Sequence, residues 1–164
     1  MSYGYAAGNQ PNFACGHCYE LKFTGSSNNA GTDDGSQSLS GKSMIVQVVN
    51  IGGIQSNQLD IMIPGGGVGA NNACTSGSSQ WGSSTKIGAQ NGGMLSQCKS
   101  QSTDYSTYKS CVLSMCTAAF GGSGMSDLLA GCDWFVNWYG AADNPNFNYT
   151  EVSCPSAINS VSGM

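Results

Sequence analysis

Asp60 is the first residue whose type and setting could do chemistry. It stands between Leu59 and Ile61 in an apolar run, and a Pro-Gly-Gly-Gly turn follows at residues 64–67. A carboxyl group in a partly apolar cleft is suited to the work of a general acid, which gives its proton to a leaving oxygen. The pattern alone allows two other interpretations, in which Asp60 faces outward on an alternating strand or caps the turn.

Other carboxylates are weaker candidates for chemistry. Asp33 and Asp34 lie in a Gly/Ser-rich loop, where a solvated turn is the expected role. Asp127 is expected at the start of a helix, and Asp133 beside a strand. His17 is the single histidine of the chain and no nucleophile signature accompanies it, so we expect a surface residue rather than part of a catalytic triad.

The cysteines indicate an oxidising compartment. Their number is even, which suits a disulfide framework. The alternative is a metal site, because Cys15 and Cys18 have the two-residue gap of a zinc knuckle, but no second pair of that kind follows. Disulfides are therefore the prediction, with no metal and no cofactor. The eight cysteines are residues 15, 18, 74, 98, 111, 116, 132 and 154.

Composition limits the classes of partner. The 164 residues correspond to one domain, and only 9% of them are charged, with a net charge of −4 and no Arg. So few cations argue against nucleic acid and against an anionic membrane. The polar surface must consist mainly of Ser, Thr, Asn and Gln, which suits a neutral, hydroxyl-rich partner. No apolar run approaches the ~20 residues of a membrane span, and no secretion signal precedes the cysteine-rich part.

Periodicity predicts a mostly β domain with short helices in its loops. The run at 44–51 is β-branched and continuous, which predicts a buried strand that ends at Gly52 and Gly53. Further strands are expected at 19–23, 59–63, 133–139 and 147–154, and helical segments at 107–120 and 126–131.

Several long motifs carry a resemblance to a known family. Residues 15–25 (CGHCYELKFTG) and 41–53 (GKSMIVQVVNIGG) are similar to two strands of glycoside hydrolase family 45. Residues 57–69 (NQLDIMIPGGGVG) resemble the segment that carries the general acid of that family, and residues 131–139 and 142–154 resemble its closing strands. The resemblance runs in order from about Tyr3 to Gly163.

This resemblance implies a six-stranded double-psi β-barrel and an endo-β-1,4-glucanase that hydrolyses internal bonds of cellulose with inversion. It implies that Asp60 is the general acid, and it makes Asn57, Gly66 and Gly67 candidate substrate-binding residues. An inverting mechanism also needs a second carboxylate as general base, roughly 6.5–9.5 Å away. Asp143 corresponds to a structural turn of the family.

Departures from the family pattern concern the base. The family begins with a strand that carries the sequence Thr-Arg-Tyr-Trp-Asp, whose Asp is the base, and no such sequence occurs here. We therefore expect residues 1–164 to be a single catalytic domain, truncated at its N-terminus, with the base in the missing segment and weak or no activity by itself. A further family Asp is replaced at 53–55 (Gly-Ile-Gln), and Gln58 stands where many members have His.

Family correspondence also implies the covalent pairing. Cys18 is expected to pair with Cys154, and Cys116 with Cys132. Cys15 and Cys74 correspond to positions whose partners lie in the missing segment. Cys98 and Cys111 lie in an apparent insertion that they could close together.

Four aromatic residues are candidates for stacking on sugar rings. Trp81, in a Ser/Gly-rich loop, is the best cleft candidate, whereas Trp134 and Trp138 are expected to pack in the core. Tyr139 completes the set.

Two functions from different classes remain open at this point. The long motifs around Asp60 favour a secreted, extracellular glucanase that acts on cellulose or a related β-glucan and is a monomer when complete. The absent base favours a non-hydrolytic, expansin-like wall-loosening protein, since expansins share the barrel and an acid-like Asp.

Overall fold

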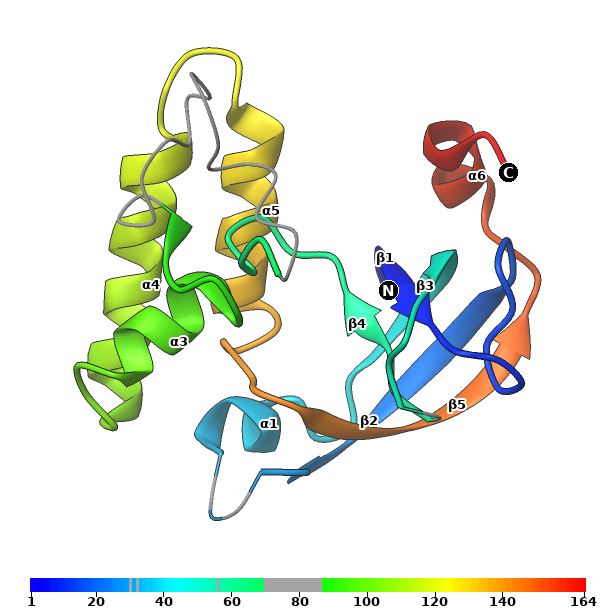
Figure 1. Ribbon diagram of the computed structural model, residues 1–164, viewed down its shortest axis with the longest axis horizontal. Helices are drawn as coiled ribbons and strands as arrows, with labels where there is room; N and C mark the ends of the chain where they lie inside the picture. Colours follow the sequence, from blue (N-terminus) through cyan, green and yellow to red (C-terminus); the bar gives the residue numbers. More distant parts are fainter. Residues whose placement is uncertain (30, 32, 56, 70–86) are drawn as a thin grey trace.

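The fold is known from a computed structural model of the chain, which describes residues 1–29, 31, 33–55, 57–69 and 87–164. Five strands form one mixed sheet in the order β4-β1-β3-β2-β5. Strands β1 and β3 are parallel, and the other neighbours in the sheet are antiparallel. Three helices lie together on one side of the molecule, and the sheet lies on the other, with β4 between them (Figure 1).

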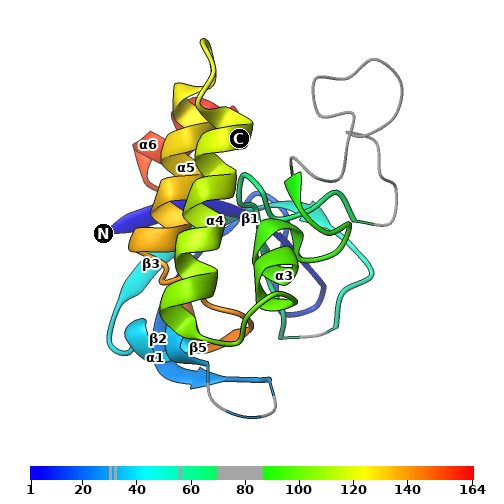
Figure 2. The ribbon, with the colours of Figure 1, turned by 90° about the vertical axis from the view of Figure 1, so that its left-hand side faces the viewer.

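The strands have the following bounds: β1 Ser2–Gly8, β2 Cys18–Ser27, β3 Ser43–Ile51, β4 Asp60–Ile61 and β5 Pro145–Val152. The helices are α1 Asp34–Ser38, α3 Gly93–Lys99, α4 Tyr105–Phe120, α5 Ser126–Asn137 and α6 Ser156–Ser162. Helices α3, α4 and α5 pack side by side in both ribbon views (Figures 1 and 2).

Strand β3 forms the centre of the sheet, as its apolar sequence predicted. It lies between β1 and β2, and Met44, Val46 and Val48 are fully buried. These side chains join one core that continues into the helical side through residues such as Val112 and Val136. The three side chains of β3 lie on one face of the strand, which is fully buried, whereas Ile45 and Val49 on the other face are half-buried.

Strand β1 was not expected from its sequence. Glycine and alanine are poor strand formers, and they make up most of residues 4–8. The structure needs small residues here, because a Cβ atom at Gly8 would lie 2.7 Å from Cβ of Phe13 and 3.3 Å from Val48. Tertiary packing against β3 thus outweighs local propensity.

The predicted strand at 133–139 is wrong. Helix α5 continues from Ser126 to Asn137, and its buried residues Cys132, Phe135 and Val136 follow the spacing of a helix face. Gly131 was expected to end a helical turn, but it lies inside α5. A Cβ atom there would lie 2.9 Å from Cγ of Pro64, so this glycine allows the turn after β4 to approach the helix closely.

The other predicted elements are confirmed, with different limits. Strands β2 and β5 and helix α4 cover most of the residues expected for them, whereas β4 contains two residues in place of the expected five. Asp104 caps α4 by accepting a hydrogen bond from the backbone N–H of Thr107 at 2.8 Å. Hydrogen bonds from the side chains of Thr107 and Ser106 and from this backbone group lower the pKa of Asp104.

Three disulfides hold the elements together. Cys18 in β2 is bonded to Cys154 after β5, and Cys116 in α4 to Cys132 in α5, as the family resemblance implied. Cys98 at the end of α3 is bonded to Cys111 in α4, so this pair does close the apparent insertion. Cys15 is free and exposed. Cys74 lies outside the described residues.

The β architecture with helices in disulfide-bonded loops is confirmed. Six strands and a closed double-psi barrel stay a prediction, because the described residues form an ordered sheet of five strands. No helix in the described ranges is both long and apolar enough to cross a membrane.

Candidate active-site groove

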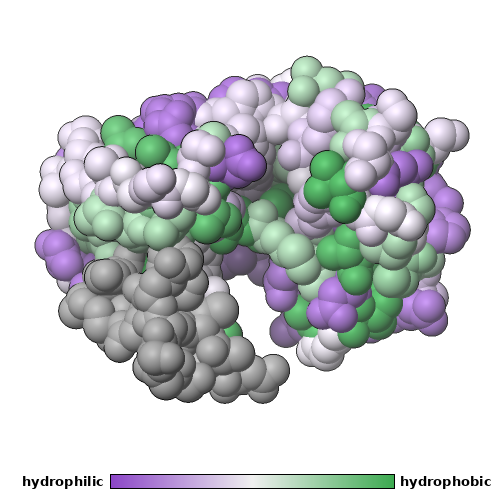
Figure 3. All heavy atoms as spheres, turned by 90° about the horizontal axis from the view of Figure 1, so that it is seen from above, coloured by the Kyte–Doolittle hydropathy of each residue, from purple (hydrophilic) through white to green (hydrophobic). Residues whose placement is uncertain are grey.

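A groove of about 870 Å³ lies between the sheet and the helices. Its lining comes mainly from three parts of the chain: residues 55 and 57–69 around β4, residues 90–95 at the start of α3, and residues 142–147 at the start of β5. A second hollow of about 400 Å³ is lined by Tyr3, Tyr5 and Trp134 among others. Seen from above, the surface is hollowed between the helical side and the sheet side (Figure 3).

Asp60 lines the larger groove beside the Pro64 turn, as the sequence predicted. It pairs with Ala7 of β1 at the edge of the sheet, and its side chain is exposed. The apolar environment inferred from the sequence comes from Leu59, Ile61 and Ile63, which are partly buried against the core. Asp60 is therefore a carboxylate on an edge strand, accessible to a ligand, and its neighbours in the chain pack against the core.

The glycine turn after Asp60 is fixed by the start of α3. The N–H of Met94 donates to the carbonyl of Gly65 at 2.9 Å, and the N–H groups of Val68 and Gly69 both donate to the carbonyl of Gln90 at 3.0 Å. Gly93 has φ +55, and a Cβ atom there would lie 1.9 Å from the Gly65 carbonyl oxygen. The two backbone segments can approach this closely only because glycine stands at the contact.

Gly93→Ala is therefore expected to push the Pro64 turn away from α3. We expect a loss of about 3 kcal/mol in the free energy of unfolding, from backbone strain at positive φ and from the clash. Any hydrolytic rate should fall about 10-fold or more, because the turn follows the proposed acid directly. Chemical denaturation and reducing-sugar assays measure the two effects.

Gly53→Ala is the matched control for this variant. A Cβ atom at Gly53 would have no neighbouring atom of the described residues within 4 Å, and the φ of this residue is not positive. The control should keep the parental stability and rate. A Gly93→Ala protein as stable as the parent would show that the close contact between the turn and α3 does not exist in solution.

Three of the predicted substrate-binding residues line the groove with Asp60. Asn57 is exposed, and its Oδ1 accepts a hydrogen bond from Nδ2 of Asn12 at 2.7 Å. Gly66 and Gly67 are exposed in the turn. Trp81, the fourth predicted residue, lies outside the described residues.

The remaining aromatic candidates divide between core and groove. Trp134 and Trp138 are stacked with their ring centroids 5.4 Å apart and pack against the core, as expected. Tyr139 lines the groove but is only 5% exposed, so its ring forms part of the floor. Burial, and to a lesser degree the charge of Asp33, raises the pKa of Tyr139, so this phenol stays neutral.

The lining of the groove is polar but mostly uncharged. Among the described lining residues, Asp60 and Asp143 are the only carboxylic acids, and no Lys or His occurs. Eight amide side chains line it: Asn28, Gln55, Asn57, Gln58, Gln90, Asn91, Asn144 and Asn146. Amides both donate and accept hydrogen bonds, which suits a ligand that presents many neutral hydroxyl groups.

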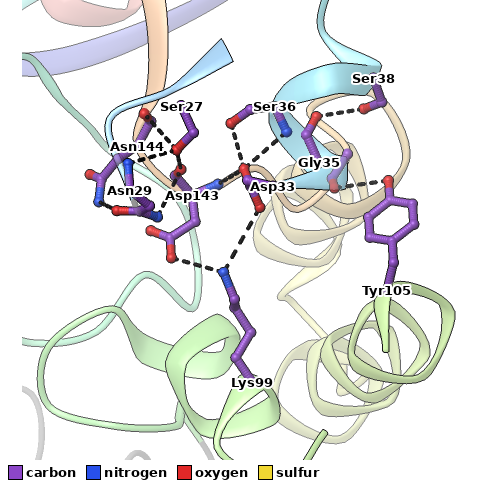
Figure 4. Close-up of polar contacts among 11 residues, drawn as sticks. Ser27, Asn29, Asp33, Gly35, Ser36, Ser38, Lys99, Tyr105, Asp143 and Asn144 are labelled. Atoms are coloured by element: carbon purple, nitrogen blue, oxygen red, sulfur yellow. Dashed lines mark hydrogen bonds and ion pairs between the residues drawn. The ribbon is translucent and has the colours of Figure 1, made fainter. Parts of the chain in front are cut away.

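Asp33 differs from its expected role as a solvated turn residue. It is 6% exposed and caps α1, because its Oδ2 accepts a hydrogen bond from the N–H of Ser36 at 3.0 Å. It also lies beside Lys99 and next to the backbone of Asp143 (Figure 4). Asp34 is exposed, as predicted, and His17 is a surface residue paired with Glu151 at 2.7 Å.

Asp143 was expected only as a structural turn residue, and the structure also places it in the lining of the groove. Its place before an Asn-Pro pair is that of a turn residue, and nothing local indicates a ligand-facing carboxylate. The same holds for Gln90 and Asn91, which reach the groove only because α3 packs against the Pro64 turn.

The fold and the groove thus define a disulfide-bonded β domain with an exposed carboxylate in a polar, neutral groove. The profile of glycosyl hydrolase family 45 matches residues 1–124, and the chain belongs to this family.

The chain is also similar to individual endoglucanases and to a cellulase of known structure. Endoglucanase B of Cellvibrio japonicus is 52% identical over 169 residues, which cover 100% of this chain and 32% of the relative. An endoglucanase of Cryptopygus antarcticus is 35% identical over 164 residues, covering 96% of this chain and 57% of the relative. The crystal structure of a cellulase from the Antarctic springtail, Cryptopygus antarcticus, superposes with a TM-score of 0.59, covering 96% of this chain and 62% of that one. The chain therefore spans about a third to just over a half of the curated relatives named here.

Proposed function

We propose that this protein is an endo-β-1,4-glucanase that hydrolyses internal bonds of cellulose or a related β-glucan with inversion, with residues 1–164 forming a single catalytic domain. The observation that carries the proposal is the position of Asp60, exposed in a groove of neutral amide side chains and next to the family's Pro-Gly-Gly-Gly turn. Family membership and relatives that are endoglucanases support it.

Asp60 would act as the general acid that protonates the glycosidic oxygen. In an inverting hydrolase, a second carboxylate deprotonates the water that attacks from the opposite face of the sugar. The amides around Asp60 would bind sugar hydroxyls, and Asn57, Gly66 and Gly67 would form the part of the binding surface next to the acid. The three disulfides support a secreted, extracellular protein.

Hydrolysis of carboxymethyl cellulose tests this function. An endo-acting enzyme should lower the viscosity of the polymer much faster than it releases reducing ends. Inversion predicts that the newly formed reducing ends appear first as the α-anomer, which proton NMR detects. The decisive protein is one that also carries the family's base-bearing strand at its N-terminus, because residues 1–164 by themselves are expected to have weak activity. If that protein binds cellulose but releases no reducing ends, the expansin-like alternative is supported instead, which none of the relatives named above favours.

A further inference from the structure

Asp143 is, with Asp60, one of the two carboxylates that line the groove within the described part of the chain. It lies in the turn before β5, and its side chain is 37% exposed. The two carboxylates come from separate segments, since Asp60 belongs to β4 at the other end of the sheet order. Because both residues line the groove, a ligand chain that spans it would contact Asp143 as well as Asp60.

The backbone of Asp143 is held from two sides. Its N–H donates a hydrogen bond to Oδ2 of Asp33 at 3.0 Å. Its carbonyl accepts hydrogen bonds from Oγ of Ser27 at 2.8 Å and from Nδ2 of Asn29 at 3.2 Å (Figure 4). These contacts fix the point from which the side chain extends.

Lys99 fixes the side chain itself. Its Nζ donates to Oδ2 of Asp143 at 3.0 Å and lies 3.8 Å from Oδ1 of the buried Asp33. Figure 4 shows Lys99 reaching from α3 to a point between the two carboxylates. The Cys98–Cys111 disulfide adjoins Lys99 and ties α3 to α4, so the lysine itself extends from a restrained helix end.

One oxygen of Asp143 stays available to a ligand. Oδ2 is engaged by Lys99, whereas Oδ1 has no hydrogen-bond partner within the part of the chain that the structure describes. A carboxylate oxygen that is held in place makes short, charge-assisted hydrogen bonds with hydroxyl donors. Sugar hydroxyls are donors of this kind.

We propose that Asp143 is a substrate-binding residue of the groove, which accepts a hydrogen bond from a glucosyl hydroxyl through Oδ1, and that Lys99 is a positioning residue that orients its carboxylate. The inference rests on the proposed function, because the ligand is a β-1,4-glucan. It adds a specific residue, remote in sequence from the Asp60 segment, to the surface that binds the sugar chain.

The test is calorimetric titration with cellohexaose on an Asp60→Asn background, in which turnover is suppressed. Adding Asp143→Ala should raise the Kd about 10-fold, as expected for the loss of a hydrogen bond to a charged group in a partly exposed site. Asp143→Asn keeps an acceptor oxygen and should have a smaller effect. Asp133→Ala is the matched control, because Asp133 is exposed on α5 and does not line the groove.

Lys99 is tested by its own pair of variants. Lys99→Met should raise the Kd for cellohexaose several-fold, and Lys99→Arg should restore much of the affinity because arginine can still bond both carboxylates. Lys109→Met is the control, since Lys109 contacts the ring of Tyr105 and neither carboxylate. In hydrolysis assays with the parental Asp60, the Lys99→Met change should appear mainly in KM rather than in kcat.

The outcomes separate the inference from the proposed function. A Kd unchanged by Asp143→Ala, with the fold intact by circular dichroism, overturns the inference and leaves the glucanase function standing. The inference is also overturned if Asp143→Ala leaves the Kd unchanged but greatly lowers kcat in the protein with the parental Asp60. Asp143 would then act in the chemical step. Absence of any cellohexaose binding by the Asp60→Asn protein overturns the proposed function, and the inference with it.

Discussion

In a protein that also carries the family's base-bearing strand, Asp60→Asn is expected to lower the rate of cellulose hydrolysis by about 10²-fold or more, because the amide cannot give a proton to the leaving oxygen. The size of the side chain is unchanged, and Asp60 has an exposed side chain on the two-residue strand β4. Stability and cellohexaose affinity should therefore stay near the parental values. Initial rates of reducing-end release from carboxymethyl cellulose give the comparison.

The matched control for Asp60→Asn is Asp133→Asn. Asp133 is an exposed carboxylate on α5, where Oδ1 accepts a hydrogen bond from Asn137 at 2.8 Å, and it lies outside the groove. The Asp133→Asn variant should retain the parental rate. If Asp60→Asn also hydrolysed the polymer at the parental rate, Asp60 could not be the general acid.

Replacing both Cys18 and Cys154 by serine is expected to cost about 4 kcal/mol of folding free energy. This disulfide joins residues 136 positions apart, so its loss returns a large conformational freedom to the unfolded chain. It also links β2 to the segment after β5, and β2 and β5 themselves pair along most of their lengths. The midpoint of urea denaturation, measured without reducing agent, reports the change.

Cys15→Ser is the control for the disulfide variant, because Cys15 is free and exposed. It should leave the denaturation midpoint unchanged. Peptide mapping without reduction provides an independent check, since Cys18 should be found linked to Cys154. A double variant as stable as the parent would show that the bond contributes little, whatever its geometry.

Much of the sheet and the place of Asp60 could be predicted from the sequence. The apolar run at 44–51 predicts a buried strand by itself, and in the structure one face of this strand is fully buried and the other is half-buried. The glycine turn after Asp60 is equally local, because Pro64 cannot donate to a sheet and Gly65 and Gly67 adopt positive φ. The pairs Cys18–Cys154 and Cys116–Cys132 followed from family resemblance, because cysteine spacing alone leaves the pairing undetermined, and the Cys98–Cys111 bond was left open until the structure showed it.

Helix α5 shows where local pattern was insufficient. Residues 133–139 contain large aromatic and β-branched side chains that suit a strand equally well. Whether this segment forms a helix or a strand depends on what it packs against. As a helix, it buries Cys132, Phe135 and Val136 in one core with α4, and Gly131 accommodates Pro64. A short apolar segment thus takes the structure that buries it best.

The sequence by itself determined the family, the central strand, the glycine turn that follows Asp60 and the presence of a disulfide framework. Tertiary structure alone decided that Asp33 is buried, that Lys99 bonds Asp143, and that amides from distant segments share a groove with Asp60. Lys99 and Asp143 are 44 positions apart, and Asp33 and Asp143 are 110 apart. Contacts over such separations form only when the intervening helices and strands pack, so no local pattern can encode them.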